Sequence, residues 1–237
     1  MPKVCAFIFA RGGSKGLPRK NILPIGGLPM LVHGIRIAQQ LDNVAGVYVS
    51  TDCVEITTIA REAGAEVIIR PAELAGDLAP EWHAWQHAIR VVQETYGNFE
   101  YFLSLPPTAP LRNLEDVENC LEALRPDVDI VITMTAARRS PWFNMVTTDK
   151  TGAVSLVINK DVICRRQDSP QCFDVATVAY VARPEFILSA DKIWDGRVTG
   201  VEVPIERGLD IDTSFDFALA KFVMEQLNHD RKFTPLP

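Results

Sequence analysis

Short apolar runs and amphipathic segments alternate along the first 135 residues of the chain. The apolar runs are 3–9, 46–50, 66–69, 101–105 and 129–133, and apolar residues recur at helical spacing over 29–41, 54–63, 81–95 and 114–124. The run 3–9 is unbroken and rich in β-formers, which is typical of a strand covered on both faces. Because strand–helix–strand units cross over with one hand, the alternation predicts a mostly parallel sheet with helices on both faces. We therefore expect an α/β domain of three layers, αβα.

The pattern changes between residues 137 and 172. Residues 138–142 are irregular, 146–157 have the composition of a hairpin turning near 150–152, and 165–168 are polar. Structureless loops of this length are uncommon without a function or a partner, although a long surface loop is the alternative interpretation. We expect residues 137–172 to form a small extended dimerisation arm, and hence a homodimer. Residues 1–136 and 173–237 then form the main domain, with strands at 176–181 and 201–205 and a closing helix at 215–227.

Composition and charge exclude several classes of protein. The 237 residues are 47% hydrophobic and 23% charged, which excludes wholesale disorder, and the net charge of −6 argues against a general nucleic-acid binder. The longest apolar run, Val4–Ala10, is far shorter than the ~20 residues of a membrane helix. The first residues also lack the apolar region and cleavage site of a signal peptide. We expect a cytoplasmic protein that binds neither membranes nor nucleic acid.

A loop rich in glycine and positive charge follows the first predicted strand. Residues 10–21 are ARGGSKGLPRKN, with glycines at 12, 13 and 16 and cations at 11, 15, 19 and 20. Glycine lets backbone N–H groups turn toward an anion, and open α/β sheets bind ligands where strands end. The spacing matches neither the Walker A loop nor G-x-G-x-x-G. The loop therefore predicts a site for a nucleoside triphosphate of another class; a solvated basic turn is the alternative.

Two aspartates stand two residues apart late in the chain. Asp210 and Asp212 flank Ile211, and on a strand both carboxylates point to one face. Paired carboxylates suit Mg²⁺, which takes one or two of them together with substrate phosphates. Alternatively, Asp212 or Thr213 caps the following helix, with Asp216 in its first turn. The two roles are compatible, and we expect Asp210 and Asp212 to ligate the metal.

Five segments in order along the chain resemble a known family. They are the loop 11–21 (RGGSKGLPRKN), 49–52 (VSTD), 70–77 (RPAELAGD), 107–112 (PTAPLR) and 210–213 (DIDT). Together they resemble the N-acylneuraminate cytidylyltransferases, or CMP-sialic acid synthetases. The resemblance implies a Rossmann-like nucleotidyltransferase domain that uses CTP, Mg²⁺ and a sialic-acid-like α-keto sugar acid and releases pyrophosphate. It assigns catalysis to Arg11, Lys20, Asp210 and Asp212, and the nucleotide to Ala10, Arg11, Gly12, Gly13, Ser14, Lys20, Asn21 and Arg70. A strand-end surface arginine is the alternative for Arg70.

The departures from this family gather where the family meets its acceptor sugar. Pro106 stands where glutamine is common, and Ala176-Thr177 replaces a frequent Asn-Gly. Pro106 and Thr177 therefore predict an acceptor other than ordinary N-acetylneuraminate, such as a legionaminate, a pseudaminate or a related nonulosonate. Arg165 and Arg166 are candidates to reach the neighbouring subunit's acceptor carboxylate, with a solvated turn as the alternative.

Other reactions remain open at this point. Glu81 occupies a position where the family often has serine near the base, so the contact with cytosine is open. An eight-carbon ulosonate, a different nucleoside triphosphate or a catalytically silent nucleotide-binding dimer are the alternatives. No side chain identifies itself as a general base.

Overall fold

The computed structural model describes residues 2–159 and 165–229, which contain a seven-stranded sheet. Its strands are β1 (Val4–Phe9), β4 (Val44–Thr51), β5 (Glu66–Ile69), β6 (Tyr101–Ser104), β7 (Ile130–Ala136), β10 (Phe173–Ala182) and β11 (Val198–Glu202). They lie in the order β11-β7-β10-β6-β1-β4-β5. Only β10 among them is antiparallel to its neighbours, β6 and β7. The predicted mostly parallel sheet is confirmed.

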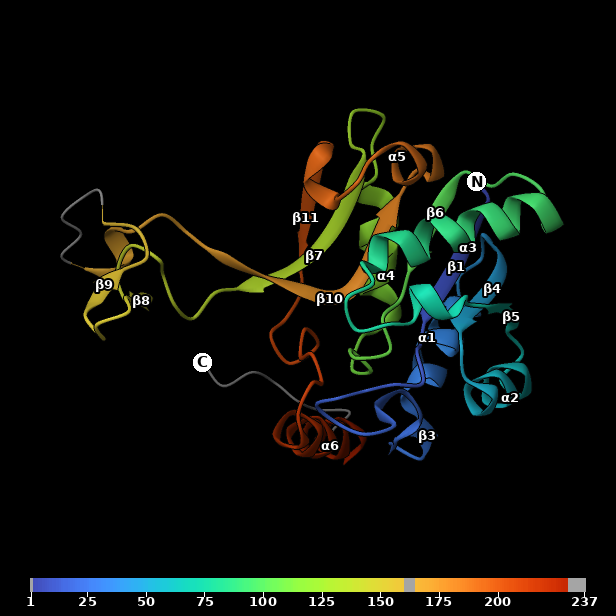
Figure 1. Ribbon diagram of the computed structural model, residues 1–237, viewed down its shortest axis with the longest axis horizontal. Coiled ribbons are helices and arrows are strands. Elements are labelled where there is room, and N and C mark those ends of the chain that lie inside the picture. Colours follow the sequence, from blue (N-terminus) through green and yellow to red (C-terminus); the bar gives the residue numbers. More distant parts are fainter. Residues whose placement is uncertain (1, 160–164, 230–237) are drawn as a thin grey trace.

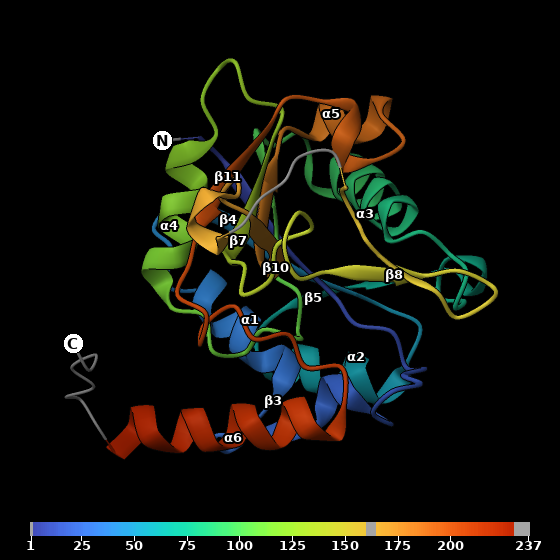
Figure 2. The ribbon, with the colours of Figure 1, turned by 90° about the vertical axis from the view of Figure 1, so that its left-hand side faces the viewer.

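Helices cover both faces of this sheet (Figures 1 and 2). One face packs against α1 (Met30–Ala38), α2 (Val54–Glu62) and α4 (Leu114–Ala123), and the other against α3 (Glu81–Tyr96) and α5 (Pro184–Ser189). The three-layer αβα arrangement is therefore confirmed, although the sequence analysis did not predict α5. Within the described ranges, none of the helices combines the length and the apolarity needed to cross a lipid bilayer.

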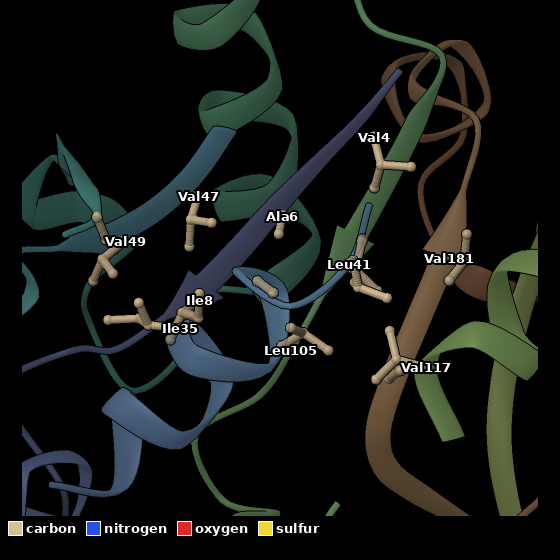
Figure 3. Close-up of a cluster of buried hydrophobic side chains, with 14 of the residues drawn as sticks. Val4, Ala6, Ile8, Ile35, Leu41, Val47, Val49, Leu105, Val117 and Val181 are labelled. Atoms are coloured by element: carbon tan, nitrogen blue, oxygen red, sulfur yellow. The ribbon is translucent and has the colours of Figure 1, made fainter. Parts of the chain in front are cut away.

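Strand β1 lies at the centre of the molecule because its side chains are apolar on both faces. Val4, Ala6 and Ile8 belong to the cluster beneath α1, α2 and α4, part of which is drawn in Figure 3. Cys5 and Phe7 alternate with them and pack with the aromatic cluster around α3. Each large side chain buried in this way contributes about 1.5–3 kcal/mol. The unbroken apolar run at the start of the sequence thus forms an interior strand of the sheet, between β6 and β4.

The closing helix α6 (Ser214–His229) lies apart from the helices on the two faces of the sheet. It packs beside the short hairpin formed by β2 (Pro24–Ile25) and β3 (Leu28–Pro29). Figure 2 shows α6 beneath the sheet. Ile25, Ile211 and Ala220 lie in one small buried cluster. This cluster joins the β2–β3 hairpin, which follows the glycine-rich loop 10–21, to α6 and the segment before it. Two segments far apart in the sequence, 24–30 and 211–224, are therefore held together at one edge of the sheet.

Residues 137–159 and 165–172, between β7 and β10, extend away from the sheet (Figure 1). The predicted hairpin is present as β8 (Val146–Thr148) paired with β9 (Val154–Leu156), and it forms its own two-stranded sheet. Residues 160–164 of the predicted arm lie outside the described residues. The hairpin is confirmed, whereas its role in dimerisation stays a prediction.

Two expectations near the C-terminus are wrong. The last strand covers Val198–Glu202 instead of 201–205, and Asp210–Asp212 lies in no strand. Pro204 follows β11, and the chain leaves the sheet there because proline lacks the N–H that a ladder needs. The Ile211 N–H instead donates to the Thr108 carbonyl at 2.9 Å. Ile211 is fully buried while both aspartates reach the cavity described below, so the alternation of side chains survives without a strand.

Candidate active site

A cavity of about 650 Å³ opens at the edge of the sheet where β1, β5 and β6 end. Phe9 is the last residue of β1, Arg70 follows β5, and Pro106 comes shortly after β6. Parallel strands deliver these residues to one edge, which is where ligands bind in open α/β sheets. Of the residues predicted for the site, the cavity is lined by Arg11, Ser14, Lys20, Asn21, Arg70, Pro106, Thr177, Asp210 and Asp212.

The loop after β1 is held in shape by contacts within the loop and by Asp52 and Glu55 from the segment after β4. The Gly12 N–H donates to Asp52 Oδ1 at 2.9 Å, and Asn21 Nδ2 donates to the Arg11 carbonyl at 3.0 Å. Arg19 has a φ of 57°, and its guanidinium pairs with Glu55. This left-handed residue starts a turn of 3-10 helix over Lys20–Ile22. These contacts fix the conformation of the loop, and Lys20 lines the cavity.

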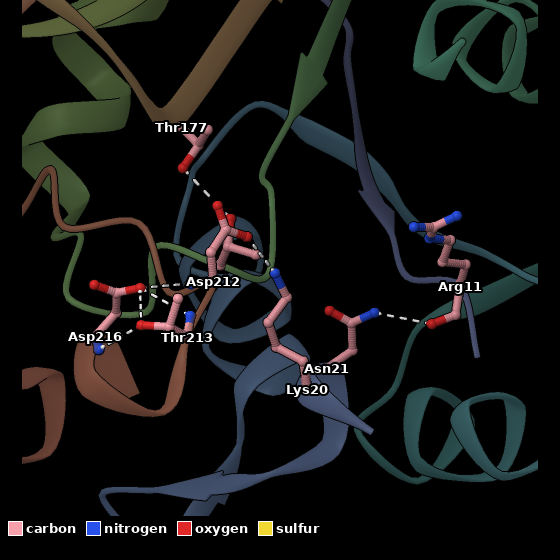
Figure 4. A network of polar contacts seen from close by, with 8 residues as sticks. Arg11, Lys20, Asn21, Thr177, Asp212, Thr213 and Asp216 are labelled. Atoms are coloured by element: carbon pink, nitrogen blue, oxygen red, sulfur yellow. Dashed lines mark hydrogen bonds and ion pairs between the residues drawn. The ribbon is translucent and has the colours of Figure 1, made fainter. Parts of the chain in front are cut away.

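Lys20 and Asp212 meet across the cavity. Lys20 Nζ lies 2.7 Å from Asp212 Oδ1, and the Lys20 side chain is only 14% exposed (Figure 4). The backbones are also close, because a Cβ on Gly16 would lie 2.6 Å from the Asp212 carbonyl oxygen. Only glycine fits at this approach. The phosphate loop and the aspartate pair therefore face one shared cleft.

Asp210, the other aspartate of the pair, has a carboxylate oxygen without a hydrogen-bond partner among the described residues. Asp210 Oδ1 is buried and makes no hydrogen bond, and Asp212 contacts Lys20. Among the described residues, no group of three or more histidine, cysteine, aspartate or glutamate side chains is arranged for a metal. Mg²⁺ does not require such a group, since it takes one or two carboxylates and completes its shell with phosphates and water. The two carboxylates therefore fit Mg²⁺ held jointly with a substrate.

The alternative role of this segment as a helix cap is confirmed. The Thr213 N–H donates to Asp216 Oδ2 at 2.8 Å, and the Asp216 N–H donates to Thr213 Oγ1 at 3.2 Å. The Asp212 N–H also donates to Asp216 at 3.2 Å. This reciprocal pair is a capping box at the start of α6. The cap holds the backbone next to the aspartate pair, so capping and cavity lining occur together.

Charges lining the cavity balance each other. Asp77 pairs with Arg11 at 3.0 Å and with Lys15 at 2.6 Å. The hydrogen bond from Lys15 and the nearby Arg11 charge hold the pKa of Asp77 below its usual value. Among the described residues, the cationic lining side chains are Arg11, Lys15, Lys20 and Arg70, and the acidic ones are Asp77, Glu81, Asp210 and Asp212. With as many acidic as cationic side chains, this lining offers a triphosphate little net positive charge, which agrees with the metal expected at the aspartate pair.

Arg70 lies inside the protein, which contradicts the interpretation of this residue as a surface arginine. It is 7% exposed, donates to the Ser50 carbonyl at 2.8 Å and to Ser50 Oγ at 3.1 Å, and lies over the Phe9 ring. Glu81 also lines the cavity, where part of the residue is exposed. Desolvation of its carboxyl by the surrounding protein, with a smaller contribution from the Asp210 charge, raises the pKa of the Glu81 carboxyl. This end of the cavity therefore combines a fixed cation with a carboxyl that resists ionisation.

The side of the cavity with the altered residues is built around Pro106 and Thr177. Thr177 Oγ1 lies 3.4 Å from Thr108 Oγ1. The buried Arg112 guanidinium donates to the Pro106 carbonyl and, at 3.4 Å, to the Thr177 carbonyl. Burial lowers the pKa of Arg112 to about 9, so its charge is costly where it lies. Arg112 thus ties the two walls of this side together.

Several predicted residues do not line the cavity. Ala10 is buried beneath the loop, Gly12 and Gly13 belong to the loop but not to the lining, and Arg165 is exposed and paired with Asp168 at 2.8 Å in the arm. The side chain of Arg166 lies outside the described residues. Sequence reasoning missed Phe9, Thr108, Asp77 and Tyr180 as lining residues. Asp77 and Thr108 fall within the segments 70–77 and 107–112 that resemble the family, and this position in the sequence could have identified them as site residues.

The fold and the cavity together define a class of protein. A cationic glycine loop behind the first strand faces paired carboxylates across a cleft at the carboxyl ends of parallel strands, which is the arrangement expected of a nucleotidyltransferase. Comparison with known proteins makes this more specific. The family model "Cytidylyltransferase" matches residues 5–125, and the chain belongs to this family.

Individual relatives agree with the family. The chain is 32% identical to the CMP-N,N'-diacetyllegionaminic acid synthase of Campylobacter jejuni, over 96% of this chain and 97% of that protein. It is 31% identical to the post-translational flagellin modification protein B of Campylobacter coli, over 98% and 99% respectively. A solved structure of CMP:2-keto-3-deoxy-manno-octonic acid synthetase complexed with CTP has a TM-score of 0.71 at 20% identity, covering 95% of this chain and 99% of that one. The last similarity supports the fold.

Proposed function

We propose that the protein transfers CMP from CTP to the anomeric hydroxyl of a nonulosonic acid, a sialic-acid-like α-keto sugar acid, and releases pyrophosphate. The observation that carries this proposal is the convergence of Lys20 and Asp212 at 2.7 Å in one cavity, in a chain of the cytidylyltransferase family. A phosphate-binding cation and a metal-binding carboxylate must both reach the triphosphate for this reaction.

The proposed reaction forms one bond and breaks another at the α-phosphorus. The acceptor oxygen bonds to this phosphorus and passes its proton to solvent water, while the bond to the bridging oxygen of the β-phosphate breaks and pyrophosphate leaves with the electron pair. Lys20 and Arg11 stabilise the negative charge on the phosphate oxygens. Asp210 and Asp212 would hold Mg²⁺, which when bound would supply positive charge to neutralise the triphosphate. Ser14, Asn21 and Arg70 orient the nucleotide from the cavity wall.

For the acceptor, we propose a nonulosonic acid other than N-acetylneuraminate, with a legionaminate or a pseudaminate as the leading candidates. Pro106 offers no N–H to a sugar hydroxyl, and Thr177 presents a short hydroxyl at the same wall. The relatives named above include a legionaminic acid synthase that matches along nearly its whole length.

We also propose a cytoplasmic homodimer formed through the arm. The hairpin carries apolar side chains that solvent reaches, among them Met145 at 43%, Val146 at 56% and Val154 at 62% exposed. Apolar patches of this kind mark interaction sites more often than free surface.

Pyrophosphate release tests the function. The enzyme is incubated with CTP, UTP, ATP or GTP, with and without MgCl₂, and with N-acetylneuraminate, a legionaminate, a pseudaminate or an eight-carbon ulosonate. We expect release only when CTP, Mg²⁺ and a nine-carbon acid are all present. A preference for UTP, or for the eight-carbon acid, would replace the proposal with one of the alternatives given above. No release with any acceptor would indicate a silent nucleotide-binding protein.

A further inference from the structure

The antiparallel strand β10 is irregular where it borders the cavity. Its pairing with β7 is regular from Phe173 to Ala176 and again from Tyr180 to Ala182, with a register shift between Ala176 and Tyr180. Such bulges leave backbone groups without ladder partners and redirect side chains. Thr177 lies within this shift, and Thr177 and Tyr180 both line the cavity. The bulge therefore decides which β10 side chains face a substrate.

One buried hydroxyl compensates for the irregularity. Thr133 of β7 has no exposed surface, and its Oγ1 donates to the Ala176 carbonyl at 2.7 Å. The same oxygen accepts the N–H of Val178 at 3.1 Å and the N–H of Ala179 at 3.3 Å. A threonine hydroxyl has one proton and two lone pairs, so this hydroxyl is fully used by the bulge. Oγ1 is the only polar atom of the Thr133 side chain, so no other side-chain atom could make these hydrogen bonds.

Contacts on both sides transmit this geometry to the cavity wall. Ala176 and Val178 pack with Ala109 and Val203 beneath the wall, which leaves Thr177 between them. Thr177 Oγ1 then lies 3.4 Å from Thr108 Oγ1, across the cavity side that also carries Pro106. The position of the Thr177 hydroxyl thus depends on the backbone that Thr133 holds from below.

We propose that Thr133 is a positioning residue for acceptor recognition: its hydroxyl holds the β10 bulge that presents Thr177 and Tyr180 to the sugar acid. The inference rests on the proposed function, because it takes this side of the cavity as the acceptor subsite. Thr133 touches no substrate and acts through the bulge alone. Its effect therefore falls on the acceptor rather than on the nucleotide, which the loop on the other side of the cavity holds.

Two substitutions at this position separate the hydroxyl from the packing. Thr133→Val keeps the shape and removes the hydroxyl, so the Ala176 carbonyl and the N–H groups of Val178 and Ala179 lose that partner. Thr133→Ser keeps the hydroxyl and loses one methyl group. Steady-state kinetics are measured with acceptor and CTP varied in turn, at a temperature where thermal unfolding shows each variant fully folded. We expect the Val variant to raise the acceptor KM about tenfold with the CTP KM changed less than twofold, and the Ser variant to restore the acceptor KM.

A second readout addresses the bulge itself. Amide hydrogen exchange of Val178 and Ala179 should accelerate in the Val variant and stay as in the wild type in the Ser variant. An unchanged acceptor KM in the Val variant, or equal rises in both KM values, would overturn the inference, and so would unchanged exchange at these amides. Failure of the proposed function looks different, because the wild-type enzyme would then release no pyrophosphate with any sugar acid.

Discussion

Lys20 and Asp212 stand 192 positions apart in the sequence, yet Lys20 Nζ and Asp212 Oδ1 are 2.7 Å apart in the folded chain. The Lys20 side chain is 14% exposed and that of Asp212 69%, so the lysine is enclosed and the carboxylate remains accessible. An ion pair of this exposure contributes little to stability. Its value is in placing a cation and a metal-binding carboxylate at the same point of the cleft.

Replacing Lys20 tests the cation. We expect Lys20→Ala to lower kcat/KM for CTP by about 10²–10³-fold, because the charge that stabilises the phosphate oxygens is lost. The unfolding temperature should change little, since the ion pair is partly exposed. Pyrophosphate release and thermal unfolding measure the two effects. Lys221→Ala, which removes an exposed lysine of α6, is the matched control. Wild-type kcat/KM in Lys20→Ala would remove Lys20 from the phosphate site.

Replacing Asp212 tests the metal. Asp212→Asn keeps the size of the side chain and removes its charge, so we expect the Mg²⁺ concentration at half-maximal activity to rise about tenfold. Titration of MgCl₂ at saturating CTP and acceptor gives this value directly. Glu225→Gln, on the exposed surface of α6, should titrate as the wild type does. Identical titration curves for Asp212→Asn and the wild type would argue against ligation by Asp212.

The sequence predicts the main strands and helices well, because residues that become buried in the fold recur at the spacing of a strand or a helix. The run from Val4 to Phe9 is apolar at every position, and each of these residues is buried on one face or the other. Elements without such a pattern were missed. The hairpin at residues 24–29 has two residues a strand and turns through Gly26 and Gly27 at positive φ, so no periodicity marks it. The side chains of Asp210–Asp212 alternate between the cavity and the interior as in a strand, but within the described residues no neighbouring strand pairs with this segment.

The candidate site is less predictable, because contacts between distant segments leave no local pattern. Motif spacing placed Lys20 and the aspartate pair correctly in one cleft. The role of Arg112 depends on the Pro106 and Thr177 carbonyls, which only the fold brings within its reach. The β10 bulge is likewise invisible in the sequence, since it depends on a hydroxyl from the neighbouring strand.

The arm makes a prediction about assembly. Val146 and Val154 lie on one face of the β8–β9 hairpin, because Val146 pairs with Leu156 and Val154 with Thr148. If this face contacts a second copy, Val146→Asp/Val154→Asp should convert a dimer to a monomer by burying two unpaired charges. Light scattering across a concentration series measures the change. Thr147→Asp places a charge on the opposite face and should leave the dimer intact. A wild-type monomer, or a double variant that stays dimeric, would refute the arm as the interface.

Glu81 makes a prediction about pH. Burial raises the pKa of its carboxyl above the ordinary value of 4.5, so the folded state takes up a proton more readily than the unfolded state does. Stability therefore falls as pH rises from 4.5 through the raised pKa. Glu81→Gln removes this cost, and we expect its unfolding temperature to exceed that of the wild type at pH 8 and to converge with it toward pH 4. Melting curves across this range test the sign. A constant difference at all pH values would show that the carboxyl does not titrate as described.

Gly16 makes a prediction about the meeting of the loop with the aspartate segment. A Cβ at this position would lie 2.6 Å from the Asp212 carbonyl oxygen, which is closer than van der Waals contact allows. Because that oxygen belongs to the backbone, the clash cannot be relieved by rotating a side chain. Gly16→Ala should therefore push the loop and the aspartate segment apart and separate Lys20 from Asp212. We expect the CTP KM to rise about tenfold and kcat to fall, because the phosphates lose a preorganised site.

The matched comparison for this variant is Gly76→Ala, at the same cavity. A Cβ on Gly76 meets nothing within 4 Å, so the alanine fits without moving its surroundings. Kinetics of the two variants, with thermal unfolding as the check on folding, separate a general effect of alanine from the specific approach at Gly16. If Gly16→Ala binds CTP as the wild type does, the contact between the loop and Asp212 is not needed for the nucleotide site, and the account of this cleft as one preorganised unit would have to be abandoned.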